Sequence, residues 1–226
     1  MNILGIDTST ASSSACLLRG DGAVFEHEPD RVEPGRRAHA QELLPAAARV
    51  LESSGLDWPE LEAIGVGVGP GGFTGLRIGI ATARALAAAA GAELRPVSSL
   101  AALAEGIEMS DPPVPRLPLI EAGRGELFAA LYEGSQERWA PFAARPEDLA
   151  GRVREAGLSP LAAGGGAVRF RGMLETASIR IEPDRSGAHV VRALHVCRLA
   201  ERAPARPPDA VLPDYVRAPD AKPRSE

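Results

Sequence analysis

Hydrophobic positions along this chain follow two different periods, and the changes between them predict its secondary structure. Short apolar runs of strand length alternate with longer stretches in which apolar residues recur every three or four positions. The runs of strand character are 3–7, 12–19, 22–28, 63–68 and 93–97, and the helical stretches are 40–53, about 73–90 and 100–105. The turn Gly20-Asp21-Gly22 joins the second and third strands, and Ser98 and Ser99 are suited to cap the helix that follows them.

Three strands followed by helix, strand, helix, strand and helix is the order of a ribonuclease-H-like lobe, which is an α/β fold. The proline-rich stretch 111–115 interrupts this pattern. After it, strands at 117–121 and 126–132 and helices at 146–155 and 188–202 predict a second, reduced round. We therefore expect two ribonuclease-H-like lobes, of residues 1–110 and 111–205, and a poorly packed tail at 206–226 apart from the region of Tyr215.

Composition narrows the class of protein. The 226 residues are 45% hydrophobic and 24% charged, which is typical of a globular chain, and no apolar run reaches membrane-spanning length. The first residues lack the basic flank of a signal peptide, and the two cysteines have no metal-binding spacing, so we expect a cytoplasmic protein with reduced thiols. A net charge of -5 disfavours binding of RNA by this chain alone.

The segment Gly69-Pro70-Gly71-Gly72-Phe73-Thr74-Gly75-Leu76-Arg77-Ile78-Gly79 lies between a predicted buried strand and a predicted helix. Glycines at such a junction allow close backbone approach, and the start of a helix exposes unpaired N–H groups. The segment is therefore either a tight turn or an anion-binding loop. A Walker A loop is excluded, since no Gly-Lys-Ser/Thr follows and the only lysine is Lys222.

Small residues form a ridge along the helix that follows this loop. They recur every four positions, at Gly75, Gly79, Ala83, Ala87 and Gly91. Such a ridge lets another backbone approach closely, and glycine within a helix costs about 1 kcal/mol relative to alanine, which implies a packing reason. The ridge faces either a partner helix, which we favour, or the chain's own sheet.

Four stretches of the sequence together resemble the bacterial TsaB family, also called YeaZ. The Gly69–Gly79 segment is similar to the family signature GPGSFTGLRIG, with Gly72 in place of serine. The others are Met1–Thr10, the segment His39-Ala40-Gln41-Glu42-Leu43-Leu44-Pro45, and Pro213-Asp214-Tyr215-Val216-Arg217. The resemblance implies two lobes of the actin-like ATPase superfamily and a role in making threonylcarbamoyladenosine in tRNA.

The family resemblance further implies a non-catalytic scaffold. Such a subunit dimerises with TsaD, which transfers the threonylcarbamoyl group to the adenosine beside the anticodon, and TsaE docks on the pair with ATP. The tRNA would be held only by the complex, no cofactor or membrane partner is expected, and a homodimer of the isolated chain is left open. The resemblance places the interface on two helices of the first lobe, at Leu43, Leu44, Ala47, Gly75, Gly79, Ala83 and Ala87.

Catalytic and metal-binding groups are not evident. The metal-binding relatives have a second histidine four positions after the first, but Leu43 stands four positions after His39. A vestigial nucleotide site is expected at Asp7, Thr8, Gly71, Gly72 and Gly165. The alternative function is an ATP-dependent phosphotransferase of the actin-like superfamily, which would use Asp7, the loop 69–75 and the triplet 164–166. The triplet 164–166 either contacts adenosine or forms a flexible turn. Glu121 and Gly123 depart from the family's second-lobe pattern. A peptidase is the third and least favoured of the functions considered.

Overall fold

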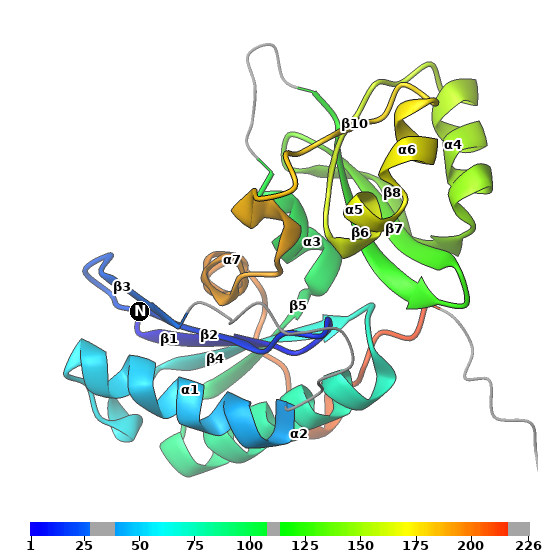
Figure 1. Ribbon diagram of the computed structural model, residues 1–226. Coiled ribbons are helices and arrows are strands. Elements are labelled where there is room, and N and C mark those ends of the chain that lie inside the picture. The colour runs from blue at the N-terminus through cyan, green and yellow to red at the C-terminus, as the bar shows by residue number, and fades with distance from the viewer. Residues whose placement is uncertain (28–38, 108–113, 217–226) are drawn as a thin grey trace, which may run out of the picture.

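Two sheets of five strands form the frame of the molecule (Figure 1), which a computed structural model describes over residues 1–27, 39–107 and 114–216. The first lobe follows the predicted order of strands and helices. Its elements are β1 (Ile3–Asp7), β2 (Ser14–Leu18), β3 (Val24–His27), α1 (His39–Ser54), β4 (Ala63–Gly69), α2 (Phe73–Ala90), β5 (Glu93–Ser98) and α3 (Ser99–Glu105). Ser98 caps α3 as expected, because its side chain accepts a hydrogen bond from the backbone N–H of Ala101.

The second lobe repeats the topology of the first. The sheets have the orders β3-β2-β1-β4-β5 and β8-β7-β6-β9-β10, each with an antiparallel meander of three strands followed by two parallel strands. This repetition confirms the predicted pair of ribonuclease-H-like lobes. The elements of the second round are β6 (Arg116–Gly123), β7 (Glu126–Glu133), β8 (Gln136–Ala144), α4 (Pro146–Glu155), β9 (Leu161–Ala163), α5 (Gly165–Arg169), α6 (Arg171–Glu175), β10 (Arg180–Ile181) and α7 (Ala193–Ala200).

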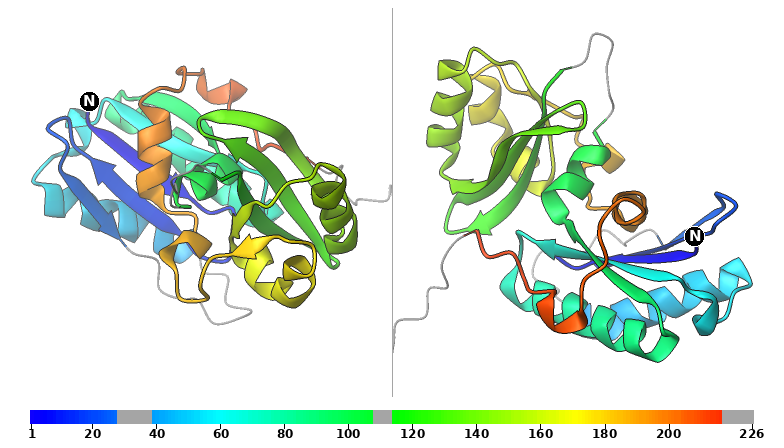
Figure 2. Two further views of the ribbon diagram at one scale, coloured as in Figure 1. Left: turned by 90° about the horizontal axis from the view of Figure 1, so that it is seen from above. Right: turned by 180° about the vertical axis from the view of Figure 1, so that it is seen from behind.

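Helices and sheets stack in five layers. Helices α1 and α2 cover the outer face of the first sheet, α3 and α7 lie between the two sheets, and α4, α5 and α6 cover the outer face of the second (Figures 1 and 2). Side chains along a strand alternate between these layers. Ile3 faces the central layer, and its neighbour Leu4 packs against α1 and α2. The lobes are therefore joined by a continuous apolar core.

Helix α7 packs on the first sheet, although the expected boundary at residue 205 assigned it to the second lobe. It lies across β1, β2, β4 and β5. The close approach depends on glycine, since a Cβ at Gly5 would lie 2.6 Å from the carbonyl oxygen of Ala193 and from Sγ of Cys197. The prediction at 188–202 was also too long, because residues 187–189 form a separate 3-10 turn and α7 begins only at Ala193.

The last described residues, 206–216, form an extended segment that we call the strap. The strap runs past the edge of the first sheet and along α2, and then turns back toward the second lobe (Figure 2). Backbone hydrogen bonds join Arg206 to Leu94 and Asp214 to Val68, and Val211 is buried among the residues of the first-lobe core. The expected tail is therefore attached to the first lobe at these three residues, although most of residues 206–216 are exposed, and residues 217–226 lie outside the described part of the chain.

No helix in the described ranges is long and apolar enough to cross a membrane.

Candidate functional site

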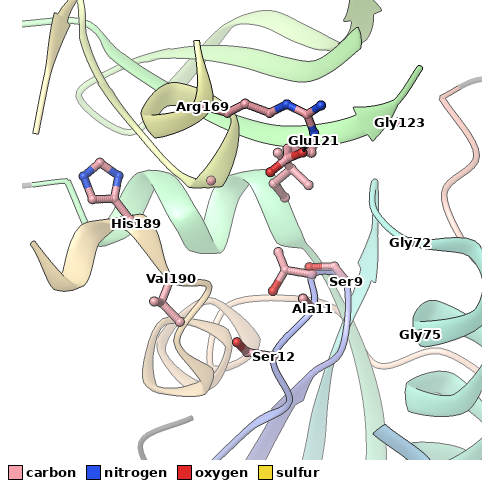
Figure 3. Close-up of a pocket in the computed structure, with 13 residues that line it drawn as sticks. Ser9, Ala11, Ser12, Gly72, Gly75, Glu121, Gly123, Arg169, His189 and Val190 are labelled. Atoms are coloured by element: carbon pink, nitrogen blue, oxygen red, sulfur yellow. Dashed lines mark hydrogen bonds and ion pairs between the residues drawn. The ribbon is translucent and has the colours of Figure 1, made fainter. Parts of the chain in front are cut away.

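A cleft of about 500 Å³ opens between the lobes at the ends of β1 and β6 (Figure 3). The first lobe contributes the turn after β1 and the start of α2, and the second contributes the end of β6, the start of α5 and the segment before α7. Its polar lining residues are Ser9, Thr10, Ser12, Glu121, Arg169 and His189, and Gly72, Gly75, Gly123 and Gly165 also line it. Of the expected nucleotide residues, Gly72 and Gly165 therefore lie at the cleft.

Asp7, at the end of β1, is enclosed rather than presented to the cleft. Its side chain is buried, and Oδ1 accepts hydrogen bonds from the backbone N–H and the hydroxyl of Ser9 at 2.8 and 2.6 Å. Oδ2 accepts a hydrogen bond of 2.7 Å from the hydroxyl of Ser99 at the start of α3. Burial raises the pKa of the Asp7 carboxyl above its usual value, while these hydrogen bonds act in the opposite direction. The carboxyl therefore connects β1 to α3.

Thr8 is buried like Asp7, and its hydroxyl donates a hydrogen bond of 2.8 Å to the carbonyl of Gly75 in the first turn of α2. The glycine loop also lies directly against the turn after β1. The N–H of Gly72 donates to the carbonyl of Ser9 at 2.7 Å, and a Cβ at Gly71 would lie 2.3 Å from that same oxygen. Because the two loops bond to each other, Gly71 has no open space in front of it. The tight-turn interpretation therefore fits the loop better than an open anion cradle.

On the second-lobe side of the cleft, the polar side chains bond within the chain. Glu121 and Arg169 form an ion pair and point toward one another in Figure 3. Nδ1 of His189 accepts a hydrogen bond of 3.1 Å from the N–H of Gly164. The proton of this neutral ring therefore lies on Nε2, which is 3.0 Å from the carbonyl oxygen of Pro183. Both ring nitrogens are already used, so His189 is poorly placed to act as a general base.

Metal-binding groups are not gathered at this cleft. Across residues 1–27, 39–107 and 114–216, no three His, Cys, Asp or Glu side chains lie close enough to hold one ion. His39 marks the first residue of α1. His195 is buried on α7, where burial lowers its pKa, and both cysteines are buried free thiols. The hydroxyls of the half-buried Thr10 and Ser12 are thus polar groups that the first lobe offers to a ligand in the cleft, whereas that of Ser9 is buried and bonded to Asp7.

The ridge of small residues faces the chain's own sheet, which corrects the interface predicted for it. Its members are buried within the first lobe except Gly91, which is exposed at the end of the helix, and two of the three α1 residues assigned to the same interface are also buried. The buried set is Leu43, Ala47, Gly75, Gly79, Ala83 and Ala87, whereas Leu44 is 49% exposed. A Cβ at Gly79 would lie only 2.2 Å from Oγ1 of Thr8, which accounts for glycine in the middle of this helix.

Sequence reasoning missed two features of this region. Arg169, which pairs with Glu121, carries no motif signal because its helix has only five residues. A cluster of exposed side chains at the other end of the glycine loop was also missed. There Phe73 stacks on Tyr215 with ring centroids 5.5 Å apart, and the guanidinium of Arg77 lies 3.8 Å from the centroid of the Phe73 ring. The resemblance had pointed to Tyr215 without indicating what it contacts.

Known proteins resemble this chain in sequence. Residues 33–162, more than half of the chain, match the family model of TsaD, tRNA N6-adenosine threonylcarbamoyltransferase. The chain is 38% identical over 133 residues to the tRNA threonylcarbamoyladenosine biosynthesis protein TsaB of Escherichia coli, an alignment that covers 59% of this chain and 55% of that protein. The uncharacterized protein Rv3421c of Mycobacterium tuberculosis is 33% identical, with 98% of this chain and 94% of that protein covered.

Solved structures show the same architecture. YeaZ from Pseudomonas aeruginosa superposes with a TM-score of 0.73 at 26% identity, and the superposition covers 94% of this chain and 100% of that one. A ROK hexokinase from Thermus thermophilus has a TM-score of 0.52 at 14% identity over 89% of this chain and 99% of that one, which is a likeness of fold alone. The fold of two lobes is therefore shared with YeaZ and with this hexokinase. Because the family model of TsaD matches more than half of its length, the chain belongs to that family, and the relatives to which it is similar include TsaB and YeaZ proteins.

Proposed function

We propose that this chain is an accessory subunit that pairs with TsaD for the synthesis of threonylcarbamoyladenosine in tRNA, and that it carries none of the chemistry itself. The pair would present a docking surface for TsaE with ATP, and TsaD would hold the tRNA. The names of relatives such as TsaB of E. coli support the pathway. The chain spans little more than half the length of that relative, so the partnership is argued from the surface of this molecule.

The observation that carries the proposal is the composition of the outer face of α2. Every exposed position of this helix beyond Arg77 is alanine, and the exposed set there is Ala81, Ala85, Ala88 and Ala89. Because the inner face is also apolar and packs on the sheet, α2 is apolar on both its inner and its outer face, and its two charged residues are Arg77 and Arg84. Helices of that kind are buried on both sides in folded assemblies, and small residues let a second helix approach closely.

Helix α1 extends this outer face. Leu44 and Pro45 are exposed, and Ala48 is exposed one turn after Leu44. The two helices lie side by side in Figure 1 and contact each other. The prediction of an interface on the two first-lobe helices is therefore kept, but its residues move from the inner faces to the outer ones. A partner that supplies two helices would complete a four-helix bundle here.

The arrangement at the cleft favours an accessory role over catalysis by this chain. Asp7 is bonded on both carboxyl oxygens, Glu121 is paired with Arg169, and both nitrogens of His189 have partners. A general acid or base must reach the reacting group, and a phosphate loop needs free N–H groups. These groups instead hold the chain's own loops in place.

Size-exclusion chromatography with light scattering tests the proposal, with this chain alone and mixed with TsaD of the same organism. We expect a heterodimer that Ala85→Arg abolishes, because an arginine there places a charge and a long side chain between closely packed helices. Ala140→Arg, the same substitution at an exposed alanine of β8, is the matched control and should bind normally. Circular dichroism should show both variants folded.

One result would count against the accessory role, and a second would count against the position of its interface. Failure of the wild-type chain to bind TsaD, with or without TsaE and ATP, would remove the partnership. Normal binding by Ala85→Arg would move the interface away from α2. A third assay measures threonylcarbamoyladenosine formed on tRNA by the reconstituted proteins, and there the Asp7→Ala chain should remain active if it carries no chemistry and stays folded.

The alternative function is phosphoryl transfer from ATP in the inter-lobe cleft, favoured by the cleft's volume and by the presence of Gly72 and Gly165 in its lining. Titration calorimetry of the isolated chain with ATP and Mg²⁺ distinguishes the two. A measurable heat of binding that Gly165→Val removes would support the phosphotransferase. Absence of heat at millimolar ATP would reject the phosphotransferase and leave the accessory role as the remaining proposal.

A further inference from the structure

A groove of about 380 Å³ runs between the strap and α2, next to the outer face of that helix. Its α2 wall is formed by residues at helical spacing, Arg77, Ile80, Ala81 and Arg84, and its strap wall by Leu212, Pro213 and Tyr215. This volume lies within the range of about 300–1,000 Å³ typical of sites that take up small ligands or a few side chains. The groove is therefore large enough to hold part of a bound segment.

The strap wall presents apolar side chains to solvent in a position that the strap's own packing maintains. Leu212 is 63% exposed, although the residue before it, Val211, is buried in the core at 1%. Arg84 Nη2 donates a hydrogen bond of 2.6 Å to the carbonyl of Val211, and Arg77 Nε donates one of 3.1 Å to the hydroxyl of Tyr215. The strap is thus held on both sides of Leu212, so the exposed leucine is a fixed feature of the surface.

Charge in the groove has one sign. The two ionisable side chains of its α2 wall are Arg77 and Arg84, and its lining contains no carboxylate. The two acidic residues of the strap, Asp209 and Asp214, are not among the lining residues. Nε of Arg84 is buried and has no hydrogen-bond partner within the described ranges. An apolar leucine beside two guanidinium groups is complementary to an apolar side chain followed closely by a carboxylate.

We infer that this groove is a second part of the partner surface and receives a segment of the partner protein that presents an apolar side chain next to an aspartate or glutamate. The inference rests on the proposed function, because Ala81 belongs both to the groove and to the outer face of α2, so that a partner covering α2 reaches the strap. An RNA is less suited to the groove, since the chain carries a net charge of -5 and the Phe73 ring is already stacked on Tyr215.

Affinity measurements with TsaD of the same organism test the inference through Leu212→Asp, whose side chain is largely exposed in the free chain. We expect Leu212→Asp to weaken binding about tenfold or more, because the apolar contact is lost and the new carboxylate repels that of the partner. Val168→Asp, an exposed apolar residue of the second lobe, is the matched control and should bind like the wild type. Arg77→Met should reduce the salt dependence of the affinity between about 50 and about 500 mM NaCl.

The buried thiols allow a second, independent readout. Cys16 and Cys197 are both inaccessible, so Leu212→Cys introduces one reactive thiol at the groove. Its labelling by a maleimide should be fast in the free chain and at least about tenfold slower in the complex. Protection by tRNA alone would identify RNA as the occupant and overturn the inference. Faster labelling after removal of residues 217–226 would identify the chain's own C-terminal segment, with the same consequence.

The design separates this inference from the proposed function. If Ala85→Arg abolishes binding while Leu212→Asp binds within about twofold of the wild type, a difference below 0.5 kcal/mol, then the partner covers the helices but not the groove. If the wild-type chain itself does not bind TsaD, the proposed function fails. Loss of binding in Leu212→Asp together with protection of Leu212→Cys is the result that we expect.

Discussion

Replacing Gly79 by alanine should destabilise the chain, although the same change in the middle of a helix usually stabilises it. The new Cβ would lie 2.2 Å from Oγ1 of Thr8, a buried side chain that donates a hydrogen bond to the carbonyl of Gly75. Either Thr8 gives up this bond or α2 moves away from β1. Overpacking of this kind costs about 1–3 kcal/mol. A lost hydrogen bond adds about 1 kcal/mol, and the better helix propensity of alanine returns about 1 kcal/mol.

The net expectation for Gly79→Ala is therefore a loss of about 1–3 kcal/mol in the free energy of unfolding, measured as a lower urea midpoint at an unchanged slope. Gly151→Ala in α4 is the matched control, since a Cβ there meets nothing within 4 Å, and it should gain about 0.5–1 kcal/mol. In a Thr8→Ala background, the Gly79→Ala change should cost at least about 1 kcal/mol less. Equal stabilisation by Gly79→Ala and Gly151→Ala would refute the close contact between α2 and Thr8.

Three further predictions concern buried groups. Because burial raises the pKa of Asp7, the folded chain binds a proton at this carboxyl more readily than the unfolded chain does. The stability of the wild type relative to Asp7→Asn should therefore increase as the pH is lowered from about 8 toward 4. A stability difference that is constant with pH in urea titrations would contradict this. The buried Cys16 and Cys197 should react with a thiol reagent only after denaturation, and the pKa of the Cys197 thiol, which burial raises, further lowers its reactivity. Fast reaction of the native chain in an absorbance assay would show that the thiols are accessible. Val211→Ala in the strap should lower stability by about 2 kcal/mol, whereas Leu212→Ala should change it by less than about 0.5 kcal/mol; equal thermal shifts would mean that the strap does not pack as described.

Most elements of the first lobe could be predicted because its strands and helices are long enough to display a period. The helix from Phe73 to Ala90 and the strand from Ala63 are close to their predicted ranges. The second lobe was harder, since β9 has three residues and β10 has two, which is too short for alternation to be recognised. Its third strand, β8, was missed, and it contains a proline that weakens the strand signal.

The orientation of α2 could not be predicted for a different reason. This helix has small residues on both its inner and its outer face, so periodicity alone does not show which face meets the sheet. The contact between Gly79 and Thr8 joins residues 71 positions apart and becomes visible only when β1 and α2 are placed together. The same limit applies to α7, because nothing in its local sequence indicates that Gly5, near the start of the chain, forms the surface on which it lies.

The position of α7 and the strap has a consequence for the order in which the chain matures during translation. All strands of the first sheet have been synthesised once Ser98 has been made. One face of this sheet is fully covered only when α7, residues 193–200, has also been made, and its edge strand β5 gains a backbone hydrogen bond from Arg206 only after that. The amino-terminal lobe is therefore completed after the second lobe, and the ribosome must release the chain as far as Arg206 before this lobe is fully packed. Until then an apolar sheet face is open to chaperones and to aggregation, so we expect premature termination before α7 to produce an insoluble product rather than a stable small domain.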